Sequence, residues 1–176
     1  TDNGRNGMEV RGGTIAANST WDQTSITYGV QGDVTVASGV ALTISAGVIV
    51  KFQGDGPGGT SYGQVASQRN LFVDGTLIAD GTAENPIYFT SLRDDTVGGD
   101  TNNDGANTVP AAGNWGRIEF RNTSTASLLD NAVVRYAGAN DYNLSGPYAP
   151  PEYYGAITLQ DASPTISSST FSNNAR

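Results

Sequence analysis

Short β-strand patterns that recur in groups of three are the feature of this sequence that most restricts its fold. Apolar residues in equivalent places of successive groups keep nearly constant offsets. The offset is 39 positions for Ile118 with Ile157 (157 − 118) and for Phe120 with Leu159 (159 − 120). It is 37 positions for Leu129 with Ile166 (166 − 129) and for Val134 with Phe171 (171 − 134). Strands this short cannot bury their side chains in hairpins, so we expect each strand to stack on its equivalent in the next group. Without the apparent insertions the repeat is roughly 20–25 residues long, which is typical of solenoids.

The strand patterns are rich in β-branched and aromatic residues, and Gly, Asp, Asn or Ser separates them. They fall at 34–36, 42–44, 48–52, 71–73, 77–79, 87–89, 118–120, 128–129, 133–136, 156–159, 165–166 and 170–171. Three short strands joined by tight turns make one rung of a β-helix. We therefore predict an all-β solenoid, a parallel β-helix of about four rungs.

Other segments do not fit the repeat. We expect residues 1–32 to form an N-terminal arm and a cap over the open edge of the first rung, and residues 33–176 to form the β-helix as one structural domain. Three inserted loops, 53–70, 93–114 and 138–155, are rich in Gly, Pro, Asn, Asp or Tyr. Since insertions in solenoids emerge from turns and often carry function, we expect 93–114 and 138–155 to form a functional flank.

Composition and charge argue against several classes of function. The 176-residue chain has no cysteine and no histidine, which excludes disulfides and the commonest ligands of transition metals. Its net charge of −8 repels phosphate backbones, so we expect no nucleic-acid binding and a preference for hard cations such as calcium. No apolar run is long enough to span a membrane. The scarcity of lysine and the abundance of Asn, Asp, Thr, Ser and Gly favour an extracellular bacterial protein.

Four segments carry a resemblance to a known family: GDVTV at 32–36, GTLIADGTAENPIYFTS at 75–91, WGRI at 115–118 and SPTI at 163–166. In this order they resemble the secreted bacterial right-handed parallel β-helix repeat proteins, which include surface and adhesin-type members and share the pectate-lyase-like superfold. The resemblance implies a right-handed β-helix outside the cell or at the bacterial cell surface. It implies no single activity, because the same rungs occur in adhesins, surface proteins and carbohydrate-active enzymes. Members usually have more coils, so we expect either a fragment of a longer protein or a last rung covered by a partner.

The segment 100–105, with the sequence DTNNDG, matches the first half of a calcium-binding loop. Oxygen ligands at alternate positions can wrap a hard cation, and the glycine allows a sharp turn. The glutamate that would complete such a loop is replaced by Ala111, but two aspartates just upstream can supply carboxylates. We therefore predict calcium as a cofactor, with Asp94, Asp95, Asp100, Asn102 and Asp104 as its ligands. The alternative is an Asn/Asp/Gly-rich turn without a metal.

Aromatic residues concentrate in the third insertion. Four tyrosines lie among three prolines there: Tyr142, Tyr148, Tyr153 and Tyr154. Flat, rigid aromatic surface beside polar groups suits stacking on sugars or contact with a protein, so we predict ligand-binding roles for these tyrosines. Alternatively, the rings pack on the flank of the solenoid. Trp115, within WGRI, is expected to be a structural ring at a corner of a rung.

Ionisable residues could also perform glycosidase or lyase chemistry. The candidate carboxylates are Glu119, Asp130, Asp141, Glu152 and Asp161, and the arginines that could polarise a uronate are Arg117, Arg121 and Arg135. A catalytic groove in a β-helix needs a long flank, which about four rungs do not offer. We therefore predict that the protein is not an enzyme and has no catalytic residues.

Three hypotheses for function follow. The leading one is a non-catalytic extracellular scaffold, a surface, adhesin-type or assembly module that presents loops to a glycan or a protein at the cell surface. The second is a subunit that stacks end to end with copies of itself into a filament, through the bare edge near 165–171 and the N-terminal cap region. The third is the N-terminal part of a polysaccharide lyase or glycoside hydrolase.

Overall fold

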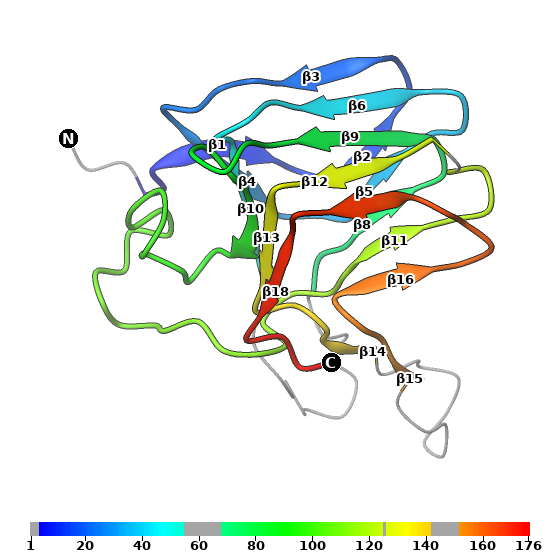
Figure 1. Cartoon of the computed structure of the whole chain (residues 1–176). Helices are drawn as coiled ribbons and strands as arrows, with labels where there is room; N and C mark the ends of the chain where they lie inside the picture. The colour runs from blue at the N-terminus through cyan, green and yellow to red at the C-terminus, as the bar shows by residue number, and fades with distance from the viewer. Residues whose placement is uncertain (1–3, 55–67, 125, 142–151) are drawn as a thin grey trace.

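The computed structural model describes residues 4–54, 68–124, 126–141 and 152–176. Within these residues every regular element is a strand, and three parallel sheets enclose one core (Figure 1). The chain passes through the three sheets in the same order in every coil, forming a right-handed parallel β-helix. The predicted fold class is confirmed. The described part of the chain has no helix that is long and apolar enough to cross a membrane.

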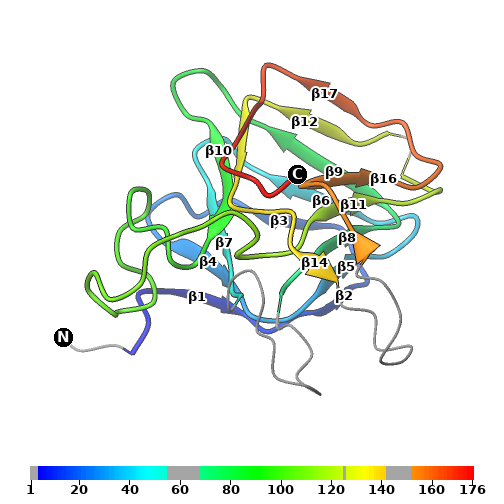
Figure 2. The ribbon, with the colours of Figure 1, turned by 90° about the horizontal axis from the view of Figure 1, so that it is seen from below.

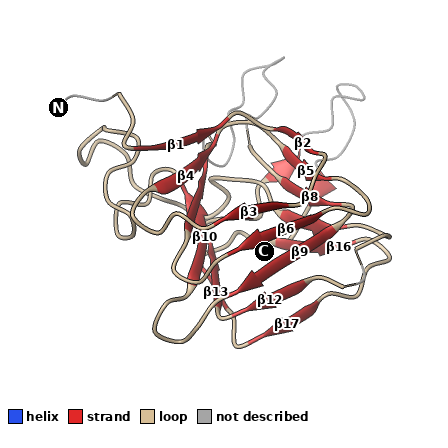
Figure 3. Ribbon diagram, turned by 90° about the horizontal axis from the view of Figure 1, so that it is seen from above, coloured by secondary structure: helices blue, strands red, loops and turns tan. Residues whose placement is uncertain are grey.

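Each sheet is a stack of strands from successive coils, and neighbouring strands are hydrogen-bonded to each other. Sheet A consists of β1 (Gly7–Val10), β4 (Thr27–Val30), β7 (Ile49–Phe52), β10 (Ile87–Ser91), β13 (Ala132–Arg135) and β18 (Thr170–Ser172). Sheet B consists of β2 (Gly13–Ile15), β5 (Val34–Val36), β8 (Leu71–Val73), β11 (Ile118–Phe120) and β16 (Ile157–Leu159). Sheet C, seen as a ladder in Figure 3, consists of β3 (Ser19–Trp21), β6 (Ala41–Ile44), β9 (Thr76–Asp80), β12 (Leu128–Asp130) and β17 (Thr165–Ser167). A separate antiparallel pair joins β14 (Asn140–Asp141) to β15 (Glu152–Tyr153).

The strands pair in the register that the sequence offsets predict. The four predicted partnerships, Ile118 with Ile157, Phe120 with Leu159, Leu129 with Ile166 and Val134 with Phe171, are all observed. Alternate residues point into the tube, so Val36, Val73 and Phe120 form one fully buried inner row of sheet B. Burial of each such side chain contributes about 1.5–3 kcal/mol, and these inner rows therefore hold the stack together.

The N-terminal segment forms a coil and not the expected cap. Strand β2 pairs in parallel with β5, and β3 pairs in parallel with β6. The described strands therefore make five coils, one more than the expected four. The sequence hid this coil because only Ile15 and Trp21 are large apolar residues in β2 and β3, where Gly, Thr and Ser fill the other positions.

All three insertions leave the solenoid at the same turn. Residues 53–70 connect β7 to β8, residues 93–114 connect β10 to β11, and residues 138–155 connect β13 to β16. Each of these connections runs from sheet A to sheet B, in three successive coils. The insertions therefore begin and end at one corner of the solenoid.

Trp115 closes this corner from the inside. It is fully buried and stacks on Phe52, with ring centres 4.2 Å apart and planes 9° apart. Its Nε1–H donates to the carbonyl oxygen of Arg135 at 2.8 Å, which satisfies its one polar atom. The structural role predicted for Trp115 is confirmed.

Candidate functional site

The outer face of sheet B carries two arginines, a glutamate and two aromatic rings, which we call the sheet B cluster. Arg117, Glu119 and Arg121 share this face because they are alternate residues along β11 and its continuation. The Nε atoms of Arg117 and Arg121 donate to the two carboxylate oxygens of Glu119, at 2.6 and 2.7 Å. The guanidinium of Arg121 lies 4.0 Å from the centre of the Phe72 ring, and that of Arg117 lies 3.6 Å from the centre of the Tyr154 ring.

Glu119 is held in its ionised form by its neighbours. Burial acts to raise the pKa of Glu119, but the hydrogen bonds from Arg121 and Arg117 and their charges outweigh it, so the pKa lies below its ordinary value. A carboxylate of this kind carries no proton near neutral pH and does not suit the role of a general acid. Within the cluster the side chains of Arg117 and Glu119 are each only 8% exposed, whereas that of Arg121 is 30% exposed and Phe72 and Tyr154 are partly exposed.

Three of the five predicted calcium ligands lie together on the second insertion. One carboxylate oxygen from each of Asp95, Asp100 and Asp104 lies within 4.8 Å of the others. Calcium binds oxygen at about 2.3–2.6 Å, so ligands on opposite sides of one ion are about 5 Å apart, and the spacing fits. Asp100 also accepts the backbone N–H groups of Asp104 and Gly105, at 3.1 and 2.8 Å, which fixes the turn that carries the group.

Asn102 lies beside these carboxylates, and its Nδ2 donates to Asp104 at 2.7 Å. The Oδ1 atoms of Asp95, Asn102 and Asp104 are buried, and none has a hydrogen-bond partner within the described residues. Burial, followed by the charge of Asp100, raises the pKa of Asp95. The group therefore has more buried oxygen acceptors than donors, an imbalance that a hard cation would correct.

Asp94, the remaining predicted ligand, faces a different set of partners. It is fully buried, and its Oδ2 accepts from Thr90 at 2.6 Å and from Nε of Arg135 at 2.8 Å. Its Oδ1 accepts the hydroxyl of Thr96 at 2.7 Å. Burial acts to raise the pKa of Asp94, but these hydrogen bonds and the charge of Arg135 hold it below its ordinary value. The structure thus uses Asp94 to fasten the insertion to sheet A.

The structure places one of the four predicted ligand-binding tyrosines in full. Tyr154 is partly buried and packs on Arg117, so it belongs to the sheet B cluster. Tyr153 is described only as part of the backbone of β15, and Tyr142 and Tyr148 lie outside the described residues.

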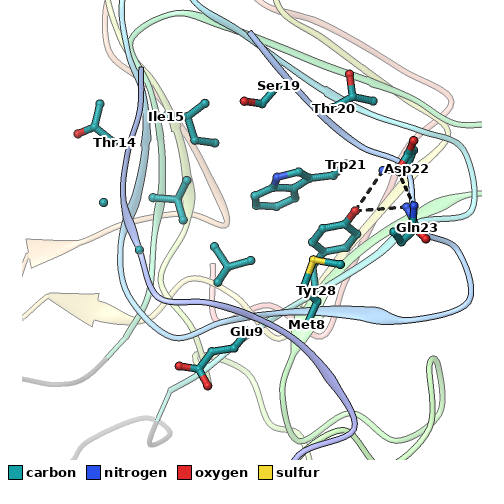
Figure 4. Close-up of a pocket in the computed structure, with 14 residues that line it drawn as sticks. Met8, Glu9, Thr14, Ile15, Ser19, Thr20, Trp21, Asp22, Gln23 and Tyr28 are labelled. Carbon is teal, nitrogen blue, oxygen red and sulfur yellow. Dashed lines mark hydrogen bonds between the residues drawn. The ribbon is translucent and has the colours of Figure 1, made fainter. Parts of the chain in front are cut away.

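The tube is open at its first coil, where a cavity of about 490 Å³ lies (Figure 4). Its inner lining includes Met8, Ile15 and Trp21, and the Trp21 ring stacks on Tyr28 with centres 4.9 Å apart and planes 11° apart. The hydroxyl of Tyr28 accepts two backbone N–H groups of the adjacent turn, at 3.1 and 3.2 Å. Because Met8 and Tyr28 pair in register between β1 and β4, this cavity is the interior of the solenoid seen from its end.

One residue that the sequence reasoning missed is Lys51, the only lysine of the chain. It lies on the outer face of β7, is fully buried, and donates through Nζ to the carbonyl oxygen of Gly99 at 2.7 Å. Burial lowers the pKa of Lys51, and nearby aspartates act in the opposite direction. The available signal was a single charged residue within the otherwise apolar run 48–52.

Comparison with known proteins gives one match. Residues 13–157, more than half of the chain, match the family model described as a pectate-lyase-like β-helix domain. The matched range runs from β2 to the start of β16 and includes the sheet B cluster and the carboxylates of the second insertion. No curated protein and no solved structure matches the chain.

Proposed function

The chain belongs to the pectate-lyase-like β-helix domain family, and within that family we propose that it is a non-catalytic extracellular scaffold that meets a glycan or a protein at the cell surface. One observation carries this proposal: the three insertions leave at the same sheet A to sheet B turn of three successive coils. Because the coils are stacked, the points where these insertions begin and end lie next to one another at one corner, and the sheets fix the spacing between these points. A partner that spans several coils at this corner would lie beside the described ends of all three insertions.

The sheet B cluster provides a contact surface next to this corner. Arg117 directly precedes β11 and lies two residues after the buried Trp115. The Phe72 ring offers a flat apolar surface to a sugar ring or a protein side chain. Arg121 lies beside it, and a guanidinium donates well to hydroxyl, carbonyl or carboxylate oxygens.

The pairing of buried acids with arginines supports a role without catalysis. Glycoside hydrolysis needs a carboxylic acid that keeps its proton near the working pH. In Glu119 and Asp94 the pKa is lowered, and both oxygens of each carboxylate already accept hydrogen bonds. Neither residue suits that task.

Calcium at Asp95, Asp100 and Asp104 forms part of the proposal. The three carboxylates and the unpartnered Oδ1 atom of Asn102 are hard oxygen donors, the type that calcium prefers. An ion bound there would offset both the burial and the repulsion from Asp100 that raise the pKa of Asp95. It would stiffen the second insertion and so fix the surface that the scaffold presents.

Glycan-array binding and a sugar-release assay test this function together. We expect the purified chain to bind glycans or a surface protein while releasing neither unsaturated nor reducing sugars from acidic polysaccharides. Release of such sugars would overturn the non-catalytic proposal and favour part of a polysaccharide lyase or glycoside hydrolase.

End-to-end association of copies is a second candidate, favoured by apolar residues on the last coil. Leu159, Ile166 and Phe171 occupy inner positions but are 52%, 38% and 45% exposed. Among the described strands, sheet A has six and sheets B and C have five each. A copy translated along the axis would therefore leave one strand position empty in sheets B and C. Continuous stacking requires a copy turned by one sheet, so that its β1 follows β16.

A further inference from the structure

Residues 94–101, which we call the strap, run along the outer face of sheet A across the stacked coils. They leave β10 in the fourth coil and lie, in green, beside β7, β4 and β1 in Figure 2. At its beginning the strap is fixed to the fourth and fifth coils. Asp94 accepts a hydrogen bond from Thr90 of β10 and forms an ion pair with Arg135 of β13. The Nη2 atom of Arg135 also donates to the hydroxyl of Thr96 at 2.6 Å.

The middle of the strap is fixed to the second and third coils. Lys51 of β7 donates to the carbonyl oxygen of Gly99 at 2.7 Å, and Thr27 of β4 approaches the carbonyl oxygen of Gly98 at 3.5 Å. A Cβ atom on Gly98 would lie only 2.5 Å from Thr27 Oγ1 and 3.2 Å from Ile49 Cδ1, so glycine permits this close approach. The strap therefore packs directly on β4 and β7.

The end of the strap reaches the first coil. The backbone N–H of Asn6, just before β1, donates to the carbonyl oxygen of Thr101 at 3.0 Å, and its side-chain Nδ2 donates to the carbonyl oxygen of Asp100 at 3.0 Å. Thr101 is almost completely buried there, at 1% exposure. One short segment thus contacts each of the five coils, and its contact between Asp100 and Asn6 joins residues 94 positions apart in the sequence.

From these contacts we infer that the strap makes the five coils open as one unit. In a solenoid each repeat normally contacts only its neighbours, so the end repeats open first. The first coil has an open cavity and few large inner side chains, and it should open readily on that basis. The strap gives this coil a direct connection to the third, fourth and fifth coils.

Native-state hydrogen exchange, measured with a chelator present, tests this inference independently of calcium. Gly98→Ala places a Cβ atom against the side chains of Thr27 and Ile49, so the packing of the strap on β4 and β7 must change. Gly99→Ala is the matched control, because both glycines have positive φ angles, 65° and 69°, but a Cβ atom on Gly99 meets no other atom within 4 Å. Both variants therefore carry similar backbone strain, and only Gly98→Ala disturbs the packing of the strap on β4 and β7.

We expect the amides of β1 to exchange about tenfold faster in Gly98→Ala than in Gly99→Ala, as for the loss of one or two hydrogen bonds. The amides of β11 should exchange at the same rate in both variants. Equal rates in β1, or an increase of equal size in every strand, would overturn the inference. If Gly98→Ala does not fold, Lys51→Met, which removes the ammonium donor to Gly99, is judged by the same comparison of β1 with β11.

Discussion

Leu159 pairs in register with Phe120 in sheet B, yet Leu159 is 52% exposed and Phe120 is fully buried. Both residues occupy inner positions of the tube. The difference arises because Phe120 has a coil on each side, whereas Leu159 has a coil on one side only. The contribution of an inner residue therefore depends on its coil as much as on its type.

We expect Phe120→Ala to lower the free energy of unfolding by about 3–5 kcal/mol, since it leaves a cavity that the neighbouring coils cannot fill. Leu159→Ala should lower it by about 1 kcal/mol, because half of that side chain already meets water. Urea denaturation of the two variants measures the difference. Equal losses would contradict the assignment of both residues to inner rows at different depths.

Calcium should raise the melting temperature of the chain. A ligand at 100 times its dissociation constant stabilises the folded state by about 2.7 kcal/mol. We expect Asp100→Asn with Asp104→Asn to abolish the shift, because they remove two of the three clustered carboxylates. Asp80→Asn with Glu84→Gln is the matched control, since it makes the same change of charge at two exposed positions. A melting temperature unmoved by calcium or chelator in the unaltered chain would remove the metal from this account.

Glu119 should make stability depend on pH in the acidic range. Its pKa in the folded protein lies below the ordinary 4.5, so its stabilisation is fully present above that pH and is lost as the pH falls through the lowered value. At neutral pH, Glu119→Gln should lower the free energy of unfolding by about 3 kcal/mol, because it leaves buried arginine charge uncompensated. The difference in the free energy of unfolding between Glu119→Gln and the unaltered chain should become smaller as the pH falls below 4.5.

Glu9→Gln is the control for this effect. Glu9 pairs with Arg11 in an exposed ion pair, which contributes about 1 kcal/mol at most. Denaturant titrations from neutral to acidic pH compare the two variants. A loss for Glu119→Gln as small as that for Glu9→Gln would mean that the sheet B cluster does not depend on its central carboxylate.

Sedimentation tests the association of copies. If copies stack through the last coil, the chain should form larger species as its concentration rises, and Phe171→Glu should abolish them by placing a charge among the exposed inner residues. Val109→Glu is the control, because Val109 is 72% exposed and belongs to the second insertion, not to the strands of the last coil. A monomer at all concentrations would dismiss the filament and leave the scaffold proposal intact.

The strand register could be predicted from sequence because inner positions need apolar residues in every coil. The offsets between Ile118 and Ile157 and between Val134 and Phe171 follow directly from this requirement. The first coil was missed because Ile15 and Trp21 are the only large apolar residues in β2 and β3. Their offsets to their partners, 36 − 15 = 21 to Val36 and 44 − 21 = 23 to Ile44, nevertheless fit the repeat.

The candidate site could be predicted only in part. Sequence spacing cannot tell which of Asp94 and Asp95 faces the metal site, since adjacent residues on a turn point in different directions. Only the structure shows that Asp94 forms an ion pair with Arg135. The strap was also beyond prediction. Its contacts to Lys51 and Asn6 use backbone carbonyl oxygens, which every residue has and which leave no trace in the sequence.

The central claim is that the corner of the insertions and the outer face of sheet B meet the partner. Two aromatic residues on different faces allow a direct comparison. Phe72 lies under Arg121 on sheet B, while Tyr88 lies on the outer face of sheet A with its ring centre 5.4 Å from the guanidinium of Arg135. In both pairs an arginine lies over an aromatic ring, so replacing either ring by alanine removes the same kind of contact.

Binding of Phe72→Ala and Tyr88→Ala to a glycan or protein that the unaltered chain binds is the most direct measurement. The account predicts that Phe72→Ala weakens the affinity about three- to tenfold, as for the loss of one aromatic contact, and that Tyr88→Ala leaves it unchanged. Full affinity in Phe72→Ala, or an equal loss in both variants, would contradict the claim.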